Sequence, residues 1–348
     1  MHTIGGMTSP LLSRPGAVAA APPDADVAAH YGEPAQEGRA LDRGAAWIDR
    51  GNRGIVRVSG PDRLSWLHSL TSQYLTDAAP GTATEALILD TKGHIRFHLS
   101  VVEDGESVWI HTEPGAAADL AAFLDSMRFM LRVEITDLTA ERRVLTVAGP
   151  DREAAVALVP DLGADIPLRR TDSGIDLFLP AESLSPVAAA LADAGIRAAG
   201  MWAHEAARIA DHRPRLGLDT DHRAIPHEMG WVGPAVHLEK GCYPGQETIA
   251  RVHNLGRPPR RLVLLHLDGT AERLPEQGSA IELDGRSVGV LGSSARHHEL
   301  GPIALGLVKR TVPVEAGFSV DGVAAGQEVV VPPDTGANAH IELRRRPA

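Results

Sequence analysis

The feature that most constrains the fold is a short unit that occurs twice. The segment 54–58 alternates apolar and polar residues as a half-buried strand does, and a Gly-Pro-Asp-Arg turn at 60–63 leads into a stretch with apolar residues at helical spacing. The same order recurs about ninety residues later, where an apolar strand at 144–147 is followed by Gly-Pro-Asp-Arg at 149–152 and an Ala-rich stretch. A repeated strand, turn and helix predicts two related α+β modules.

The C-terminal part of the chain has a different character. Short apolar runs alternate there with Gly-rich turns, and Asp284-Gly285 is a two-residue hairpin signal, so we expect a small β-barrel. The N-terminal part is rich in Ala, Pro and Gly without an apolar period, which is typical of a flexible arm. The sequence therefore predicts an α+β protein with an arm at 1–41, modules at about 42–139 and 140–257, and a barrel at 258–348.

Composition excludes several classes of protein. The 348 residues carry a formal net charge of -11, which argues against a general nucleic-acid binder because such proteins rely on clustered cations. A single cysteine, Cys242, excludes an intramolecular disulfide and a four-cysteine metal site within one chain. No apolar run approaches the length of a membrane span. We expect a cytoplasmic protein in a reducing compartment.

One loop carries most of the unusual residues. It runs from Lys240 through Cys242, Tyr243 and Gln246 to Glu247, with glycines on both sides of the cysteine, and a helix is predicted to start at Gln246. A thiol beside a lysine and near a helix N-terminus has features of a nucleophile, a redox sensor or a metal ligand. The alternative is that Cys242 is a small buried apolar residue without chemistry.

This loop resembles the signature of the YgfZ family, which includes a related mitochondrial iron–sulfur assembly factor. Further resemblance lies in the turn Asp90-Thr91-Lys92-Gly93, in the helix after Gly60-Pro61-Asp62, and in the barrel segments 288–293 and 304–308. Only about the first forty residues stand outside it.

The resemblance implies a body like that of the glycine-cleavage T-protein, with tetrahydrofolate or a derivative in a central pocket. It also implies iron–sulfur client or assembly proteins as partners, and through them an indirect role in tRNA modification without direct nucleic-acid binding. The loop residues that match the family pattern are the candidates for chemistry: Lys240, Cys242, Gln246 and Glu247.

Candidates for the folate pocket follow from what such a ligand needs. A pterin requires an aromatic slot, and its glutamate tail requires cations near the mouth. Trp202 and Arg208 are equally compatible with core and surface positions of one helix. The candidate set is Tyr243, Trp202 and Trp231 for the slot and Arg128, Arg208 and Arg251 for the cations.

Two departures from the T-protein pattern weigh against aminomethyl transfer. T-proteins place an acidic pair after the Gly-containing turn, where this chain continues from Gly93 to His98 without an acid. T-proteins also carry a glutamate in the later helix that contacts the pterin, where this chain has Ala210 followed by Asp211.

Three functions therefore remain open. The first is a folate-binding accessory factor for iron–sulfur cluster assembly or repair. The second is a folate-dependent one-carbon transferase or demethylase, and the third is a folate-binding protein without chemistry in which Cys242 is structural. We expect no metal site in the single chain, since the tightest histidine group, 297–299, is more typical of a solvated turn.

Overall fold

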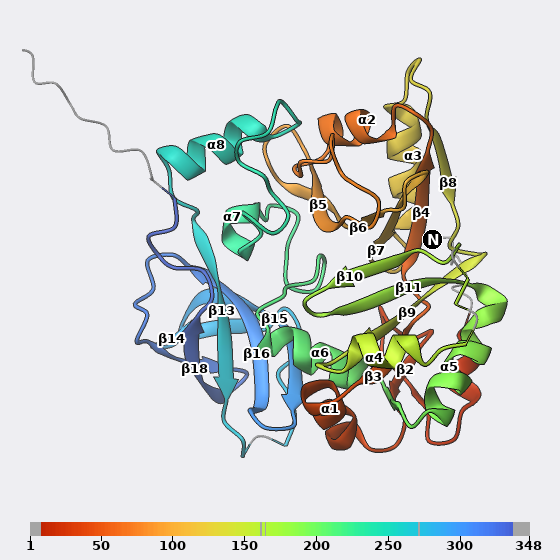
Figure 1. The fold of residues 1–348 in the computed structure, drawn as a ribbon. Helices are drawn as coiled ribbons and strands as arrows, with labels where there is room; N and C mark the ends of the chain where they lie inside the picture. The colour runs from red at the N-terminus through yellow and green to blue at the C-terminus, as the bar shows by residue number, and fades with distance from the viewer. Residues whose placement is uncertain (1–7, 161, 164, 271, 337–348) are drawn as a thin grey trace, which may run out of the picture.

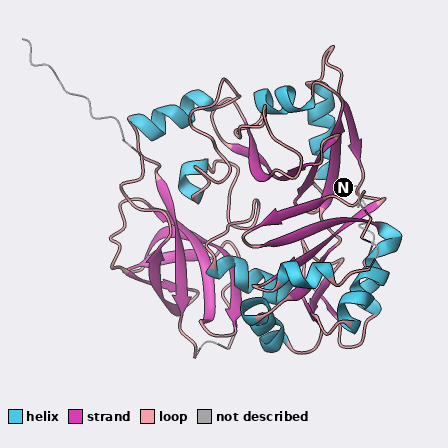
Figure 2. Cartoon of the chain, in the orientation of Figure 1, coloured by secondary structure: helices cyan, strands magenta, loops and turns pink. Residues whose placement is uncertain are grey.

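The computed structural model describes residues 8–160, 162–163, 165–270 and 272–336, and contains two five-stranded sheets and a closed six-stranded barrel (Figure 1). The sheets carry most of the helices, whereas the barrel forms a unit built of strands and loops (Figure 2). The predicted α+β class with a C-terminal β-barrel is confirmed. Among the described residues, no helix is long and apolar enough to cross a bilayer.

The first sheet has the strand order β5-β6-β7-β4-β8, with all neighbours antiparallel. Helices α2 and α3 pack on it through a core that includes Trp66, Leu67 and Leu120. The elements are β4 (Gly54–Ser59), α2 (Arg63–Leu70), β5 (Ala83–Leu89), β6 (Ile95–Glu103), β7 (Ser107–Thr112), α3 (Ala117–Ser126) and β8 (Glu134–Asp137).

The second sheet has the order β10-β11-β9-β3-β12, antiparallel except for the parallel pair β3 and β12. It packs against the first sheet through an apolar cluster that includes Trp109 and Phe178. The elements are β3 (Ala46–Arg50), β9 (Arg142–Ala148), α4 (Arg152–Ala157), β10 (Leu168–Thr171), β11 (Gly174–Pro180), η2 (Ala181–Ser183), α5 (Leu184–Asp193) and β12 (Arg197–Ala199).

The repeated Gly-Pro-Asp-Arg turn has the same backbone in both sheets. Gly60 and Gly149 both have a positive φ, of 104° and 107°. A Cβ at Gly60 would lie 2.2 Å from the carbonyl oxygen of Arg132, and one at Gly149 would lie 2.3 Å from that of Gly44. Only glycine fits either turn, because both the conformation and the close backbone contact exclude a side chain.

The structure differs from the expected arm at 1–41. Its described part, from residue 8, holds η1 (Pro10–Ser13), β1 (Val18–Ala19), β2 (Ala28–His30) and α1 (Pro34–Arg43). Leu11 and Val27 are buried in cores of the second sheet. The short strands have no periodicity, so the sequence pattern missed them. Strand β3 also joins the second sheet rather than the first, so the chain crosses between the sheets at 51–53.

The barrel closes in the order β13-β16-β15-β14-β17-β18. The predicted Asp284-Gly285 hairpin joins β14 and β15, and both residues have positive φ, as this turn requires. Helix α6 (Met201–Ala210) packs on the barrel, and α7 (Pro226–Met229) and α8 (Gln246–Asn254) connect it to the first sheet. The strands are β13 (Arg260–Leu267), β14 (Ala280–Leu283), β15 (Arg286–His297), β16 (Gly301–Lys309), β17 (Gly317–Val320) and β18 (Val323–Val329).

Candidate functional site

A cavity of about 320 Å³ lies where both sheets, α6 and the loop after it meet. Trp231 is buried directly after α7 and stacks on His98 of β6, with ring centroids 4.8 Å apart and an interplanar angle of 26°. The turn that positions Trp231 depends on Gly230, whose φ of 74° ends α7 in the left-handed region. The cavity thus has one aromatic wall.

The other wall is built from charges on the second sheet. Asp176 of β11 accepts hydrogen bonds from Thr146 at 2.6 Å and from Arg169 at 3.0 Å, and Arg50 lies 3.4 Å away. Burial alone would raise the pKa of Asp176, but His111 and these arginines outweigh it and hold the pKa well below its usual range. Asp176 is therefore a permanent anion at the cavity.

His111 is a neutral partner of this anion. Burial lowers its pKa to about 3, so the ring carries one proton near neutral pH. Arg53 donates to Nδ1 at 3.3 Å, which leaves Nε2 as the protonated nitrogen that donates to Asp176 at 3.0 Å. This network fixes the tautomer.

Glu85 connects the two walls. Its carboxylate lies 2.9 Å from His98 Nε2 and 3.8 Å from Arg169. Burial favours a raised pKa, but the interaction and hydrogen bond with His98 and the positive charges of Arg169 and Arg213 outweigh it and lower the pKa of Glu85 to about 2. Perturbed carboxyl groups that converge beside an aromatic wall are typical of a ligand site.

Three guanidinium groups at the cavity, those of Arg169, Arg208 and Arg213, have spare donors. Their Nε atoms are buried and have no hydrogen-bond partner among the described residues. A buried donor without an acceptor is unfavourable, so these groups are suited to a ligand that brings oxygen atoms.

The signature loop, residues 240–247, forms a second group outside this cavity. Lys240 is buried and donates hydrogen bonds to the carbonyl oxygens of His68 and Thr71, and its Nζ lies 4.7 Å from the ring centroid of Tyr243. Burial lowers the pKa of Lys240 to about 8. Gln246 donates to the Lys240 carbonyl oxygen at 3.1 Å, while Cys242 is exposed. The lysine therefore anchors a loop that presents the thiol to solvent.

The loop packs on the Asp90-Thr91-Lys92-Gly93 turn. Gly245 begins α8 with a φ of 82°, and a Cβ there would lie 2.7 Å from the Asp90 carbonyl oxygen and 3.0 Å from the Cα of Gly93. The two sequence motifs, far apart along the chain, thus meet backbone to backbone.

The remaining candidate residues fall in different places. Trp231 and Arg208 line the cavity, and Arg208 is buried in ion pairs with Glu205 and Asp219. Arg251 pairs with Glu247 on the exposed side of α8. Trp202 is exposed beside His30, and Arg128 pairs with Asp125 at the surface, both outside the cavity.

Sequence reasoning did not single out the charged wall. Asp176 sits between Ile175 and Leu177 in a strand that is buried on both faces, and a lone acid in such a strand is a usable signal. Nothing in the sequence places Glu85, Arg169 and His98 around one cavity, because Glu85 and His98 lie on neighbouring strands of the first sheet and Arg169 lies in the second.

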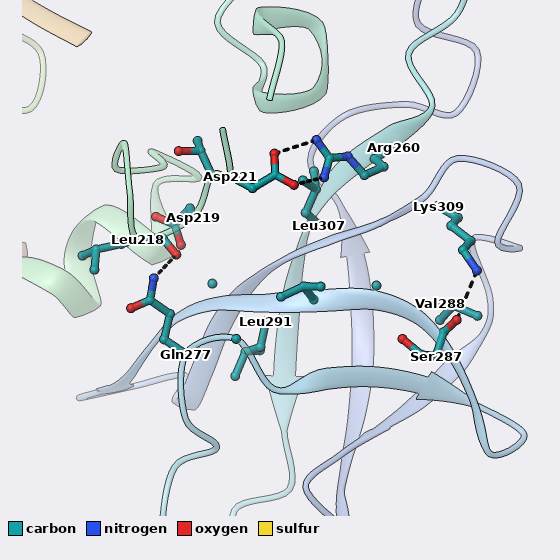
Figure 3. Close-up of a pocket in the computed structure, with 15 residues that line it drawn as sticks. Leu218, Asp219, Asp221, Arg260, Gln277, Ser287, Val288, Leu291, Leu307 and Lys309 are labelled. Carbon is teal, nitrogen blue, oxygen red and sulfur yellow. Dashed lines mark hydrogen bonds and ion pairs between the residues drawn. The ribbon is translucent and has the colours of Figure 1, made fainter. Parts of the chain in front are cut away.

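A second cavity, of about 520 Å³, lies between the loop 218–221 and the barrel (Figure 3). It is larger, but its polar groups satisfy one another. Asp221 pairs with Arg260 at 2.6 Å, and Lys309 donates to the Ser287 carbonyl oxygen at 3.2 Å (Figure 3). The central cavity is the better candidate because it has the aromatic wall and the spare donors.

Comparison with known proteins identifies the fold. The structure aligns with a glycine cleavage system aminomethyltransferase T from Bartonella henselae at a TM-score of 0.78, over 95% of this chain and 98% of that one, with 18% identity. The chain has the T-protein fold. Within it, residues 15–167 match the GCVT N-terminal domain.

Two curated relatives align with this chain over most of their own length. An aminomethyltransferase of Parasynechococcus marenigrum is 27% identical over 307 residues, which are 78% of this chain and 82% of the relative. A putative chloroplastic transferase of Arabidopsis thaliana is 26% identical over 316 residues, 83% of this chain and 70% of the relative.

Proposed function

We propose that the central cavity binds tetrahydrofolate or a derivative, and that the protein serves iron–sulfur cluster assembly or repair rather than aminomethyl transfer. The observation that carries the folate part is a cavity lined by the stacked pair Trp231 and His98 and by arginines whose buried Nε atoms have no hydrogen-bond partner among the described residues, in a chain of T-protein fold. Bound folate supplies a carrier for one-carbon groups.

The cavity suits the pterin end of such a ligand. Trp231 and His98 offer an apolar, aromatic wall to a flat heterocycle. The Nε donors of Arg169 and Arg213 match its carbonyl oxygen or the carboxylates of its tail. Glu85, ionised above pH about 2, can accept from ring N–H and amino groups. A volume of about 320 Å³ is at the small end of typical ligand sites, so the tail would extend out of the cavity.

The same geometry argues against the transfer reaction. The position after the Gly93 turn that carries an acid in T-proteins leads here to His98, which is engaged by Glu85. Ala210 has no group to offer a pterin, and Glu205, one turn earlier in α6, is held by Arg208 and Arg215. We therefore assign His98 and Glu85 to binding and not to proton transfer.

Cys242 is the proposed contact with iron–sulfur clients. It is exposed on a loop that Lys240 and Gln246 hold in place, so a partner can reach the thiol. The segment 231–240 joins this loop to the cavity, and Ser72 and Gln73, in the loop after α2, donate hydrogen bonds to the carbonyl oxygens of Ala235 and Pro234.

Calorimetric titration with tetrahydrofolate tests the binding site. We expect saturable binding at one site in the wild type and at least about tenfold weaker binding in Trp231→Ala, equivalent to a loss of about 1.4 kcal/mol. Trp202→Ala is the matched control, because it removes an exposed indole outside the cavity. Equal affinity in Trp231→Ala and wild type, or no wild-type binding at millimolar ligand, would reject the assignment.

The role of Cys242 separates the alternative functions. In cells that lack the protein, wild type but not Cys242→Ser should restore the activity of iron–sulfur enzymes, with folate affinity unchanged. Full restoration by Cys242→Ser would favour the binding protein without chemistry. Turnover of a methylated amine with tetrahydrofolate would favour the transferase.

A further inference from the structure

Three side chains of the kind that bind metals meet at the junction of α1 and the barrel. Asp42 lies near the end of α1, and His298 and Glu299 lie in the turn after β15. His298 Nε2 is 3.8 Å from an oxygen of Asp42 and 4.0 Å from an oxygen of Glu299. All three ligand atoms lie within 4.8 Å of one another, although the segments are more than 250 residues apart.

The imidazole is buried without a hydrogen-bond partner on Nε2. The side chain of His298 is 4% exposed, and Nε2 has no such partner among the described residues. A buried polar atom of this kind is normally satisfied by protein, water or an ion. Here it points at two carboxylates.

Helix α1 has room for this ring because of a glycine. A Cβ at Gly38 would lie 3.0 Å from His298 Nδ1 and 3.4 Å from the His298 Cβ. Gly38 and Asp42 are one helical turn apart, so they lie on the same face of α1. That face therefore both receives the imidazole and supplies a carboxylate beside it.

Arg43 occupies the cation position at this cluster. Its guanidinium lies 2.5 Å from Glu299 Oε1 and 3.8 Å from Asp42 Oδ2. The Arg43 side chain is 67% exposed, so it can swing into solvent and release both carboxylates. A divalent ion at the same place would interact with both carboxylates more strongly and would also ligate His298.

We propose that Asp42, His298 and Glu299 form a site for a divalent transition metal of the zinc class, which clips α1 to the hairpin of β15 and β16. One imidazole and two carboxylates are a ligand set that zinc accepts, with a remaining position for water. Zinc bonds of about 2.0–2.2 Å give ligand separations of about 3.3–3.6 Å. The two separations from His298, 3.8 and 4.0 Å, are slightly longer than this, and the whole set of ligand atoms, which spans up to 4.8 Å, would draw together on binding the ion. This proposal differs from the sequence-based expectation, which was that the single chain has no metal site.

Zinc titration of the chelator-treated full-length chain, by calorimetry and thermal melting, tests the site. Wild type should bind one equivalent of Zn²⁺ with a rise in Tm. His298→Ala and Asp42→Asn should each lose at least about tenfold in affinity and most of the Tm rise. His222→Ala, which removes an exposed histidine elsewhere, should match wild type. Cys242→Ser should also retain the site, although it removes a strong zinc ligand.

Arg43→Ala provides an independent test that does not depend on a weakened fold. Because Arg43 competes for both carboxylates, its removal should tighten Zn²⁺ binding severalfold. The proposal fails if wild type binds no stoichiometric Zn²⁺, if His298→Ala binds as wild type does, or if Arg43→Ala binds more weakly than wild type.

Discussion

At the scale of single residues, His227 in α7 has an unusual environment. Its side chain is buried, and neither ring nitrogen has a hydrogen-bond partner among the described residues. Burial, with a smaller contribution from His253, lowers the pKa of His227 to about 4. The unfolded chain takes up the proton near pH 6.5, whereas the folded chain does so only near pH 4. This histidine therefore reduces stability as the pH falls from 6.5 to 4.

Replacing His227 with leucine should flatten that pH dependence. At pH 5 the wild-type histidine costs about 2 kcal/mol relative to pH 7, and His227→Leu removes this part of the fall. Urea unfolding at pH 7 and pH 5 measures it, with the exposed His222→Leu as control. Some slope remains because His111, with a pKa of about 3, acts in the same direction. An identical fall in His227→Leu and wild type would contradict the assignment.

At the scale of elements, the contact between α8 and the turn at 90–93 depends on the residue at position 245. Gly245 combines a positive φ with a contact of 2.7 Å between a hypothetical Cβ and the Asp90 carbonyl oxygen. Gly233 also has a positive φ, of 98°, but nothing lies within 4 Å of a Cβ there. A comparison of alanine substitutions at the two glycines therefore separates the free-energy cost of the backbone conformation from that of the steric clash.

Gly245→Ala should therefore destabilise more than Gly233→Ala. We expect about 1 kcal/mol for Gly233→Ala from the conformation alone, and at least about 2 kcal/mol more for Gly245→Ala because helix and turn must separate. Denaturant unfolding gives both values. The rate at which Cys242 reacts with a thiol reagent should change only in Gly245→Ala. If both substitutions had equal effects on stability and on thiol reactivity, the close approach of position 245 to the Asp90 carbonyl oxygen would not restrict the side chain there.

At the scale of the whole molecule, Arg215 joins three parts of the chain. Its guanidinium donates hydrogen bonds to Asp24, between β1 and β2, at 2.8 Å, to Glu113, after β7, at 2.7 Å, and to Glu205 of α6 at 2.8 Å. Arg215 and Asp24 are buried. Arg208, also paired with Glu205, continues the network through Asp219 to Ser293 of the barrel. One network of charges thus joins the first sheet, the N-terminal segment that packs on the second sheet, and the barrel.

Removing Arg215 should weaken the entire assembly. Arg215→Ala leaves three carboxylates without their shared cation, and we expect a loss of about 3–5 kcal/mol in the free energy of unfolding. Arg215→Lys should recover only part of it, since an ammonium lacks the fork that serves three partners. The surface pair of Arg170 and Glu153 is the comparison, and Arg170→Ala should change stability by less than about 1 kcal/mol. A loss below about 1 kcal/mol in Arg215→Ala would rule out this role.

Several elements could be predicted from local signals in the sequence. The repeated turn at Gly60 and Gly149, the Asp284-Gly285 hairpin and the start of α8 at Gln246 all follow from backbone preferences and apolar spacing. The barrel followed for the same reason.

Which of these elements contact one another could not be predicted from local signals. The placement of β3 in the second sheet, the packing of α1 on the body, and the gathering of Glu85, His98 and Asp176 around one cavity depend on sheet order and on contacts between distant segments. The conformational preferences of a short segment do not indicate such pairings, because the pairings arise when whole apolar faces of sheets and helices are buried against one another. His298 and Asp42 illustrate this, since their sequence neighbours give no sign that they approach to 3.8 Å.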